Sequence, residues 1–107
     1  MMSPEQHIEV FNTAVVDGDW SAFVARFTDD ARVEFVGPPV GPFVGRVAIA
    51  AAYEVSPPDD TIASNGAPVF DGDELVVPYR WVTTGATGTM RFTERDGLIT
   101  LLVITFD

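Results

Sequence analysis

The chain has 107 residues, a hydrophobic fraction of 47% and a formal charge of −10, with six arginines and no lysine. This length fits one domain, residues 1–107, with a single core. The negative charge repels phosphate backbones and anionic lipid, so nucleic acid and membrane surfaces are not expected partners. With no cysteine and one histidine, disulfides, thiol catalysis and the usual zinc ligand sets are excluded, and we expect no metal site or cofactor.

The first ten residues lack a basic stretch followed by an apolar core, so we expect no secretory signal and a cytoplasmic location.

A helix is predicted to start at the capping sequence Ser3-Pro4-Glu5-Gln6 and to run to about Asp17, where Gly18 supplies a left-handed stop. The face that it turns to the core is expected to carry Ile8, Phe11 and Val15. The single histidine, His7, is expected on the solvent side.

A second, shorter helix is predicted after Asp19, with Asp29-Asp30 breaking it before a strand over residues 32–36. Its inward face is expected to carry Trp20, Phe23, Val24 and Phe27. A loop rich in glycine and proline follows, and a third helix is predicted over residues 46–55. Ser56-Pro57-Pro58 ends that helix because a residue before proline avoids helical angles.

The hydrophobic period then changes from 3.6 to 2, which predicts strands over residues 61–70, 75–84, 87–94 and 98–106. Short glycine turns join them into an antiparallel meander, and Pro78 should lie at a bulge or an edge. Helices first and strands afterwards predict an α+β fold, in which three N-terminal helices pack on a strongly bent antiparallel sheet.

The last strand is apolar on both of its faces. Leu98, Thr100, Leu102, Ile104 and Phe106 are expected to face the helices, which leaves Ile99, Leu101 and Val103 on the outer face. Because an exposed apolar patch usually marks an interface, we expect a homodimer through the outer sheet face. Arg91, on that face, is expected to pair across the sheet or the dimer, and Arg46 to cap loop carbonyls or pair with an acid near the third helix.

Taken together, these residues resemble the nuclear transport factor 2-like superfamily, which includes ketosteroid isomerases and SnoaL-like polyketide cyclases. The resemblance covers nearly the whole chain. It is carried by Asp17-Gly18-Asp19-Trp20, Phe27-Thr28-Asp29-Asp30-Ala31, Gly45-Arg46-Val47-Ala48-Ile49, Met90-Arg91-Phe92 and Asp96-Gly97-Leu98-Ile99. It implies a cone in which three helices and a curled sheet enclose a pocket. Because this fold hosts many unrelated activities, it leaves the function open.

Ketosteroid isomerase uses an aspartate base and an oxyanion hole made of a tyrosine and a protonated aspartate. The resemblance places these three groups at Phe11, Phe35 and Gly88, where all three functional groups are missing. A general base contributes about 10²–10⁴ in rate, and one oxyanion donor about 10²–10³. We therefore expect negligible steroid isomerisation by that route. The catalytic residues, if there are any, are unknown.

The resemblance places Tyr53, Tyr79, Trp81 and Thr83 on the pocket wall, and an apolar remainder fits a hydrophobic small-molecule site. The expected ligand-binding residues are Phe11, Phe35, Tyr53, Tyr79, Trp81, Thr83, Met90, Leu102, Ile104 and Phe106. Val40, Pro42 and Phe43 are expected to shape the mouth, and Asp107 is expected to point away from the pocket. The leading hypothesis is non-catalytic binding of a hydrophobic molecule. The alternatives are a SnoaL-like isomerase, cyclase or epoxide hydrolase with unidentified residues, and a sheet used mainly for protein partners.

Overall fold

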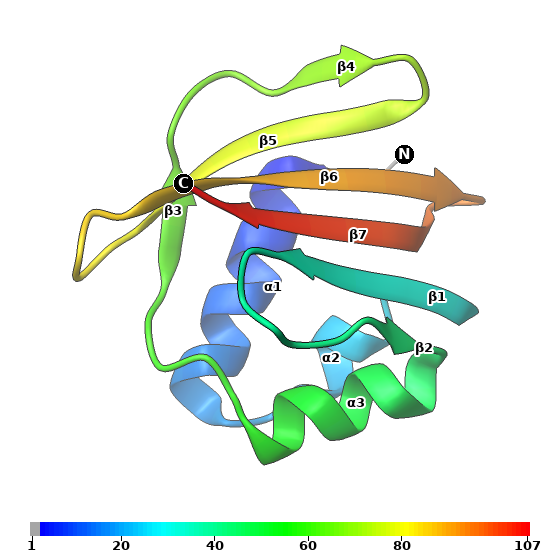
Figure 1. Cartoon of the computed structure of the whole chain (residues 1–107). Coiled ribbons are helices and arrows are strands. Elements are labelled where there is room, and N and C mark those ends of the chain that lie inside the picture. Colours follow the sequence, from blue (N-terminus) through cyan, green and yellow to red (C-terminus); the bar gives the residue numbers. More distant parts are fainter. Residues whose placement is uncertain (1–2) are drawn as a thin grey trace.

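The computed structural model describes residues 3–107, which form three helices and a seven-stranded sheet. The helices are α1 (Pro4–Asp17), α2 (Ser21–Val24) and α3 (Arg46–Val55). They gather on one side of a curved sheet (Figure 1). Among the described residues, no helix is long and apolar enough to cross a membrane.

The ends of α1 are those that the sequence predicts. The Gln6 N–H donates to Ser3 Oγ at 3.3 Å, and Gly18 has a φ of 76° and donates its N–H to the Ala14 carbonyl. Of the predicted face, Phe11 is buried, and Ile8 and Val15 are partly buried against the core. The other buried residues of the helix are His7 and Ala14. The expectation of a solvent-exposed His7 is therefore wrong.

Helix α2 is shorter than predicted and the strand after it is longer. The Asp19 carboxylate accepts the Ser21 N–H at 3.0 Å, but the helix ends at Val24. Strand β1 (Phe27–Val36) already begins at Phe27, which pairs with Ile99 of the last strand. The ladder between β1 and β7 is interrupted between Phe27 and Arg32. Phe27 is nevertheless fully buried, so the four predicted inward residues do reach the core.

The remaining strands are β2 (Phe43–Val44), β3 (Ile62–Ser64), β4 (Val69–Asp71), β5 (Glu74–Trp81), β6 (Thr87–Arg95) and β7 (Leu98–Phe106). Their order is β2-β1-β7-β6-β5-β3, and β4 also pairs with β5. The predicted α+β fold is confirmed, but β1 and β7 run parallel, so the sheet is mixed. Because these two strands are far apart in the sequence, no hairpin forces them to be antiparallel.

The strand predicted over residues 61–70 is split into β3 and β4. Both pair with β5, and residues 65–68 arch over Pro78 between them. Pro78 has no N–H to donate, and its carbonyl accepts the Asn65 N–H at 3.0 Å. The proline thus lies where the edge of the sheet is interrupted, as its chemistry predicts.

A bulge in β7 changes which face its first residues occupy. Thr93 pairs with Leu101 but Glu94 pairs with Ile99, so Thr100 is the extra residue. Ile99 consequently turns into the core with 0% exposure, and its predicted place on the outer face is wrong. Leu101 and Val103 stay on the outer face and are partly exposed.

An apolar cavity as the candidate functional site

A cavity of about 480 Å³ lies between the helices and the sheet, within the usual range of roughly 300–1,000 Å³ for small-molecule sites. Its lining is contributed by Phe11, Phe35, Pro38, Val40, Phe43, Ala52, Tyr53, Val55, Ser56, Pro58, Ile62, Tyr79, Trp81, Met90, Ile104 and Phe106. Most of these side chains are apolar. None of these sixteen described residues carries a carboxylate, an imidazole, an ammonium or a guanidinium group.

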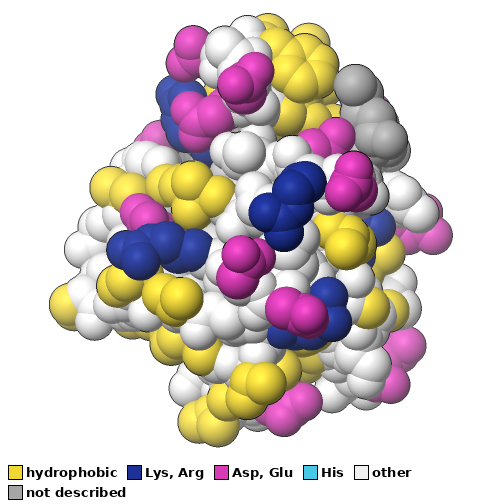
Figure 2. Space-filling model, turned by 90° about the vertical axis from the view of Figure 1, so that its right-hand side faces the viewer, with side chains coloured by type: hydrophobic (Ala, Val, Ile, Leu, Met, Phe, Trp, Pro, Cys, Tyr) yellow, Lys and Arg dark blue, Asp and Glu magenta, His cyan; other side chains and the backbone are white. Residues whose placement is uncertain are grey.

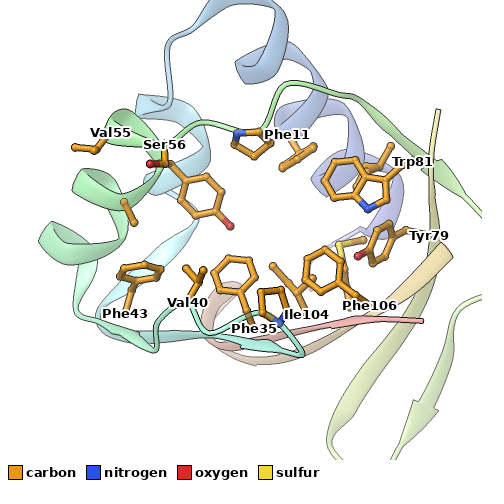
Figure 3. A pocket seen from close by; sticks show the side chains of 16 residues that line it. Phe11, Phe35, Val40, Phe43, Val55, Ser56, Tyr79, Trp81, Ile104 and Phe106 are labelled. Carbon is orange, nitrogen blue, oxygen red and sulfur yellow. The ribbon is translucent and has the colours of Figure 1, made fainter. Parts of the chain in front are cut away.

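Aromatic side chains form two opposed walls of the cavity. Phe35 of β1 and Phe106 of β7 stack with ring centroids 6.4 Å apart, and Ile104 lies on the same wall (Figure 3). Phe11 of α1 and Trp81 of β5 face them from the other side, with their own centroids 6.3 Å apart (Figure 3). The space between the walls is therefore bounded by ring faces and edges.

The mouth lies near the end of α3 and the glycine–proline loop. Val55, on α3, is 81% exposed, and Val40, in the loop, is 49% exposed, although both line the cavity. Phe43 also lines the cavity, as expected. Of the loop prolines, Pro38 lines it in place of the expected Pro42. At the opposite end, Tyr79 is almost fully buried (Figure 3). The cavity thus has an open apolar rim and a closed inner end.

Eight of the ten expected ligand-binding residues line this cavity: Phe11, Phe35, Tyr53, Tyr79, Trp81, Met90, Ile104 and Phe106. Thr83 lies elsewhere, because β5 ends at Trp81 and the alternation of faces stops there. Its N–H and hydroxyl instead donate to the Asp60 carboxylate at 3.0 and 2.9 Å. Leu102 does face inward, but it is packed in the core with 1% exposure and does not reach the cavity.

Part of the cavity wall, contributed by α3 and the segment after it, was not predicted from the sequence. Ala52 and Ser56 line the cavity together with Tyr53, and Pro58 and Ile62 continue the same wall. Helical spacing contains the missing signal, since Ala52 lies four residues before Ser56 and Tyr53 lies three before it. Once Tyr53 is placed on the cavity wall, helical spacing therefore predicts that Ala52 and Ser56 lie on it as well.

The two tyrosines of the lining are neutral donors over the physiological range. Burial raises the pKa of Tyr53, and the nearby Tyr79 raises it further. Burial also raises the pKa of Tyr79, against a smaller opposing effect of a hydrogen bond with Trp81. The Tyr79 hydroxyl donates to the Thr105 carbonyl at 3.4 Å, so it is directed at the backbone. Neither phenol is suited to act as a base at neutral pH.

His7 lies outside this cavity, in the packed core. Its ring is 4.7 Å from the ring of Phe92 and 5.6 Å from that of Phe23, measured between centroids, and 1% of the residue is exposed. Burial, with a contribution from Arg26, lowers the pKa of His7 to about 3. Its Nδ1 has no hydrogen-bond partner among the described residues. His7 is thus a neutral core residue that does not line the cavity.

Three polar residues outside the cavity behave as expected. Arg46 Nε donates to the Phe27 carbonyl at 3.1 Å, and its Nη1 lies 3.0 Å from the Asp29 carboxylate, which ties the start of α3 to β1. Arg91 pairs with Asp71 on the outer sheet face. Asp107 accepts a hydrogen bond from the Thr87 hydroxyl at 2.6 Å, away from the cavity lining.

Three helices against a curved mixed sheet, with an apolar cavity between them, define the NTF2-like cone fold. The chain belongs to the SnoaL-like domain family, whose model matches residues 6–102. No curated protein matches the chain.

Solved structures share the fold at low sequence identity. A candidate polyketide cyclase from Sinorhizobium meliloti is 24% identical with a TM-score of 0.68, and the match covers 92% of this chain and 93% of that one. An NTF2-like protein of unknown function from Burkholderia xenovorans is 16% identical, with a TM-score of 0.71 and coverages of 96% and 81%. A candidate ketosteroid isomerase from Kribbella flavida is 18% identical, with a TM-score of 0.70 and coverages of 96% and 78%. At these identities the likeness shows the fold alone.

Proposed function

We propose that the protein binds an uncharged, hydrophobic small molecule in the cavity between the helices and the sheet. The observation that supports this most directly is a cavity of about 480 Å³ with an apolar lining and no charged side chain in it. At the packing density of protein interiors, such a volume holds roughly 15–20 non-hydrogen atoms. A charged ligand would lose its hydration without gaining a partner, so charge acts against binding.

Tyr53 is the group best suited to orient such a ligand. Its side chain comes from α3, the residue is 5% exposed, and it lines the cavity. The Tyr79 hydroxyl already donates to the backbone of β7, so it is less free to serve a ligand. A neutral molecule with one carbonyl or ether oxygen would accept a hydrogen bond from Tyr53 and bury its remaining surface against the aromatic walls.

Ketosteroid isomerase chemistry is not part of this proposal. The positions that the resemblance matches to its acid and base groups carry Phe11 and Phe35, which line the cavity, and Gly88, which has no side chain. The other residues of the lining offer no replacement carboxylate.

The alternative remains an enzyme, because relatives of the fold carry names of isomerases and cyclases. Such an enzyme would need to raise the reactivity of its substrate through neutral donors such as Tyr53.

We also propose a homodimer through the outer face of the sheet. Val76, Arg91 and Val103 lie side by side on β5, β6 and β7 and are partly exposed. Arg91 pairs there with Asp71 at 3.3 Å, so its charge is partly compensated within one chain. Light scattering at micromolar concentration should give twice the mass of the chain, and Val103→Asp should give a monomer. A monomeric wild-type protein would refute this part.

The binding proposal is tested with a neutral apolar dye, N-phenyl-1-naphthylamine, whose fluorescence rises in apolar sites. Ala52→Phe fills the cavity from α3, whereas Ala51→Phe adds the same ring at the adjacent exposed position. We expect wild type and Ala51→Phe to bind the dye with equal affinity, and Ala52→Phe to bind it at least tenfold more weakly. Equal binding by both variants would place the dye elsewhere and contradict the proposal.

A test for turnover separates binding from catalysis. We expect purified protein to leave a 5-ene-3-keto steroid unchanged over hours, because the residues at the matched acid and base positions carry no acidic or basic group. Substantial isomerisation would overturn the non-catalytic reading and direct attention to Tyr53, whose replacement by phenylalanine should then lower the rate.

A further inference from the structure

Tyr79 and Gly88 face each other across β5 and β6 in a way that depends on the missing side chain. A Cβ on Gly88 would lie 2.6 Å from both Cζ and Oη of Tyr79 and 2.2 Å from the carbonyl oxygen of Thr105. Carbon atoms do not approach other groups so closely, so no larger residue fits while this arrangement persists. The requirement for glycine is one of space, because Gly88 has no positive φ.

The ring of Tyr79 occupies the space that Gly88 leaves empty. Gly88 is paired with Tyr79 on one side and with Phe106 of β7 on the other, so the tyrosine leans across β6 towards β7. Its hydroxyl reaches the Thr105 carbonyl at 3.4 Å, and Trp81 packs against its ring edge to face at 5.7 Å. These contacts hold the ring in one place.

In this position the Tyr79 ring closes the inner end of the cavity. Tyr79 is 1% exposed and lines the cavity at the end opposite Val55 and Ser56 (Figure 3). The ring lies against Gly88, which has no side chain to fill this space. If the ring were smaller, the cavity would extend over Gly88 towards the backbone of β6 and β7.

We propose that the Tyr79–Gly88 pair sets the maximum length of ligand that the cavity accepts. Gly88 provides the recess, and the ring of Tyr79 fills it and stops the ligand. This inference rests on the proposed binding function and specifies the ligand class further: an uncharged molecule short enough to end at the ring of Tyr79. If the ring only covers Gly88 and stabilises the sheet, shortening the side chain would not change the maximum length of ligand that binds.

A homologous series of neutral ligands distinguishes these roles. The probes are straight-chain 2-alkanones from 2-octanone to 2-tetradecanone, measured by displacement of the naphthylamine dye. For wild type we expect the affinity to rise about fourfold for each methylene until a cut-off length and then to stop rising. In Tyr79→Leu and Tyr79→Ala the cut-off should move to longer chains. Tyr79→Phe keeps the ring and therefore the wild-type cut-off, whatever its overall affinity.

Phe70→Ala is the matched control, because it truncates another aromatic residue, 62% exposed on β4 and absent from the cavity lining. Circular dichroism checks that each variant is folded, and if Tyr79→Ala is not, Tyr79→Leu decides. Ketone binding with the same cut-off in wild type and Tyr79→Leu would overturn this inference and leave the binding function intact. Failure of wild type to bind any ketone or the dye would overturn the binding function itself.

Discussion

Replacing His7 should remove a large part of the sensitivity of this protein to acid. An unfolded histidine has a pKa of about 6.5, whereas the pKa of the buried His7 is about 3. Between these values the unfolded chain binds a proton that the native state does not, so the free energy of unfolding falls as the pH falls. Protonating His7 in the native state would put a cation between two phenylalanine rings and near Arg26, which itself faces Glu94.

The size of the effect follows from the difference in pKa. Each pH unit below about 6.5 costs up to ~1.4 kcal/mol, so the loss attributable to His7 is about 2 kcal/mol at pH 5 and on the order of 4 kcal/mol at pH 3. A small domain has a total free energy of unfolding of only about 5–15 kcal/mol. A single buried imidazole therefore accounts for a substantial share of the acid sensitivity.

Urea unfolding of wild type and His7→Met between pH 7.5 and 5 measures this contribution. Methionine suits a helix and a packed core, and no hydrogen bond to His7 Nδ1 is lost by the change. We expect His7→Met to be nearly independent of pH over this window, while a control, Ile8→Met at the half-buried neighbouring position, keeps the wild-type slope. Equal slopes in wild type and His7→Met, or a His7 ring that titrates near pH 6.5 by NMR, would refute the reasoning.

Three further changes have defined outcomes. Asn12→Ala removes two hydrogen bonds of 2.9 Å to the backbone of Ile62. In denaturant titrations it should lower the free energy of unfolding by about 2 kcal/mol, and a loss below about 0.5 kcal/mol would show that water replaces the amide. Gly88→Ala should lower the free energy of unfolding by several kcal/mol. Adding Tyr79→Ala should not restore stability, because the Thr105 carbonyl is the atom nearest to the new Cβ. Restored stability in the double variant would show that the new Cβ clashes with the Tyr79 ring alone. Arg91→Ala breaks a half-exposed ion pair with Asp71 and should change the stability of the monomer by less than about 1 kcal/mol. It should weaken the proposed dimer in sedimentation experiments, and unchanged dimerisation would show that the interface lies elsewhere.

Features fixed by neighbouring residues could be predicted from the sequence. Helix α1 begins and ends where Ser3 and Gly18 place it, because a cap and a left-handed residue act within one turn. The edge position of Pro78 follows in the same way from its missing N–H. The cone and most of the cavity wall followed from the resemblance and from strand alternation, which carried residues such as Trp81 and Ile104 to the cavity.

The errors arise where tertiary structure shifts or ends a periodic pattern. The bulge at Thr100 reverses the faces of β7 before it and sends Ile99 inward. On α1, the packing of α2 and β6 selects a face that includes His7, although periodicity favours the face of Ile8, Phe11 and Val15. Alternation likewise extended past the end of β5 to Thr83. Tertiary contacts decide such shifts, and no local signal in the sequence reports them.

The surface shows how the negative charge of the chain is distributed. Acidic side chains lie next to arginines on the face in Figure 2, and hydrophobic side chains appear there in small separate groups. Arg32, Arg46, Arg91 and Arg95 each have a carboxylate within 4 Å. The charge of these four arginines is therefore partly compensated within the chain.

The amide of Asn12 has a consequence for the behaviour of the protein in concentrated solution. Strand β3 lies at the end of the sheet, where unpaired backbone groups would template the addition of a strand from another molecule. The side chain of Asn12 accepts the N–H and donates to the carbonyl of Ile62, so it occupies both backbone groups as a neighbouring strand would. One helical side chain thus ends the sheet there and guards against edge-to-edge aggregation.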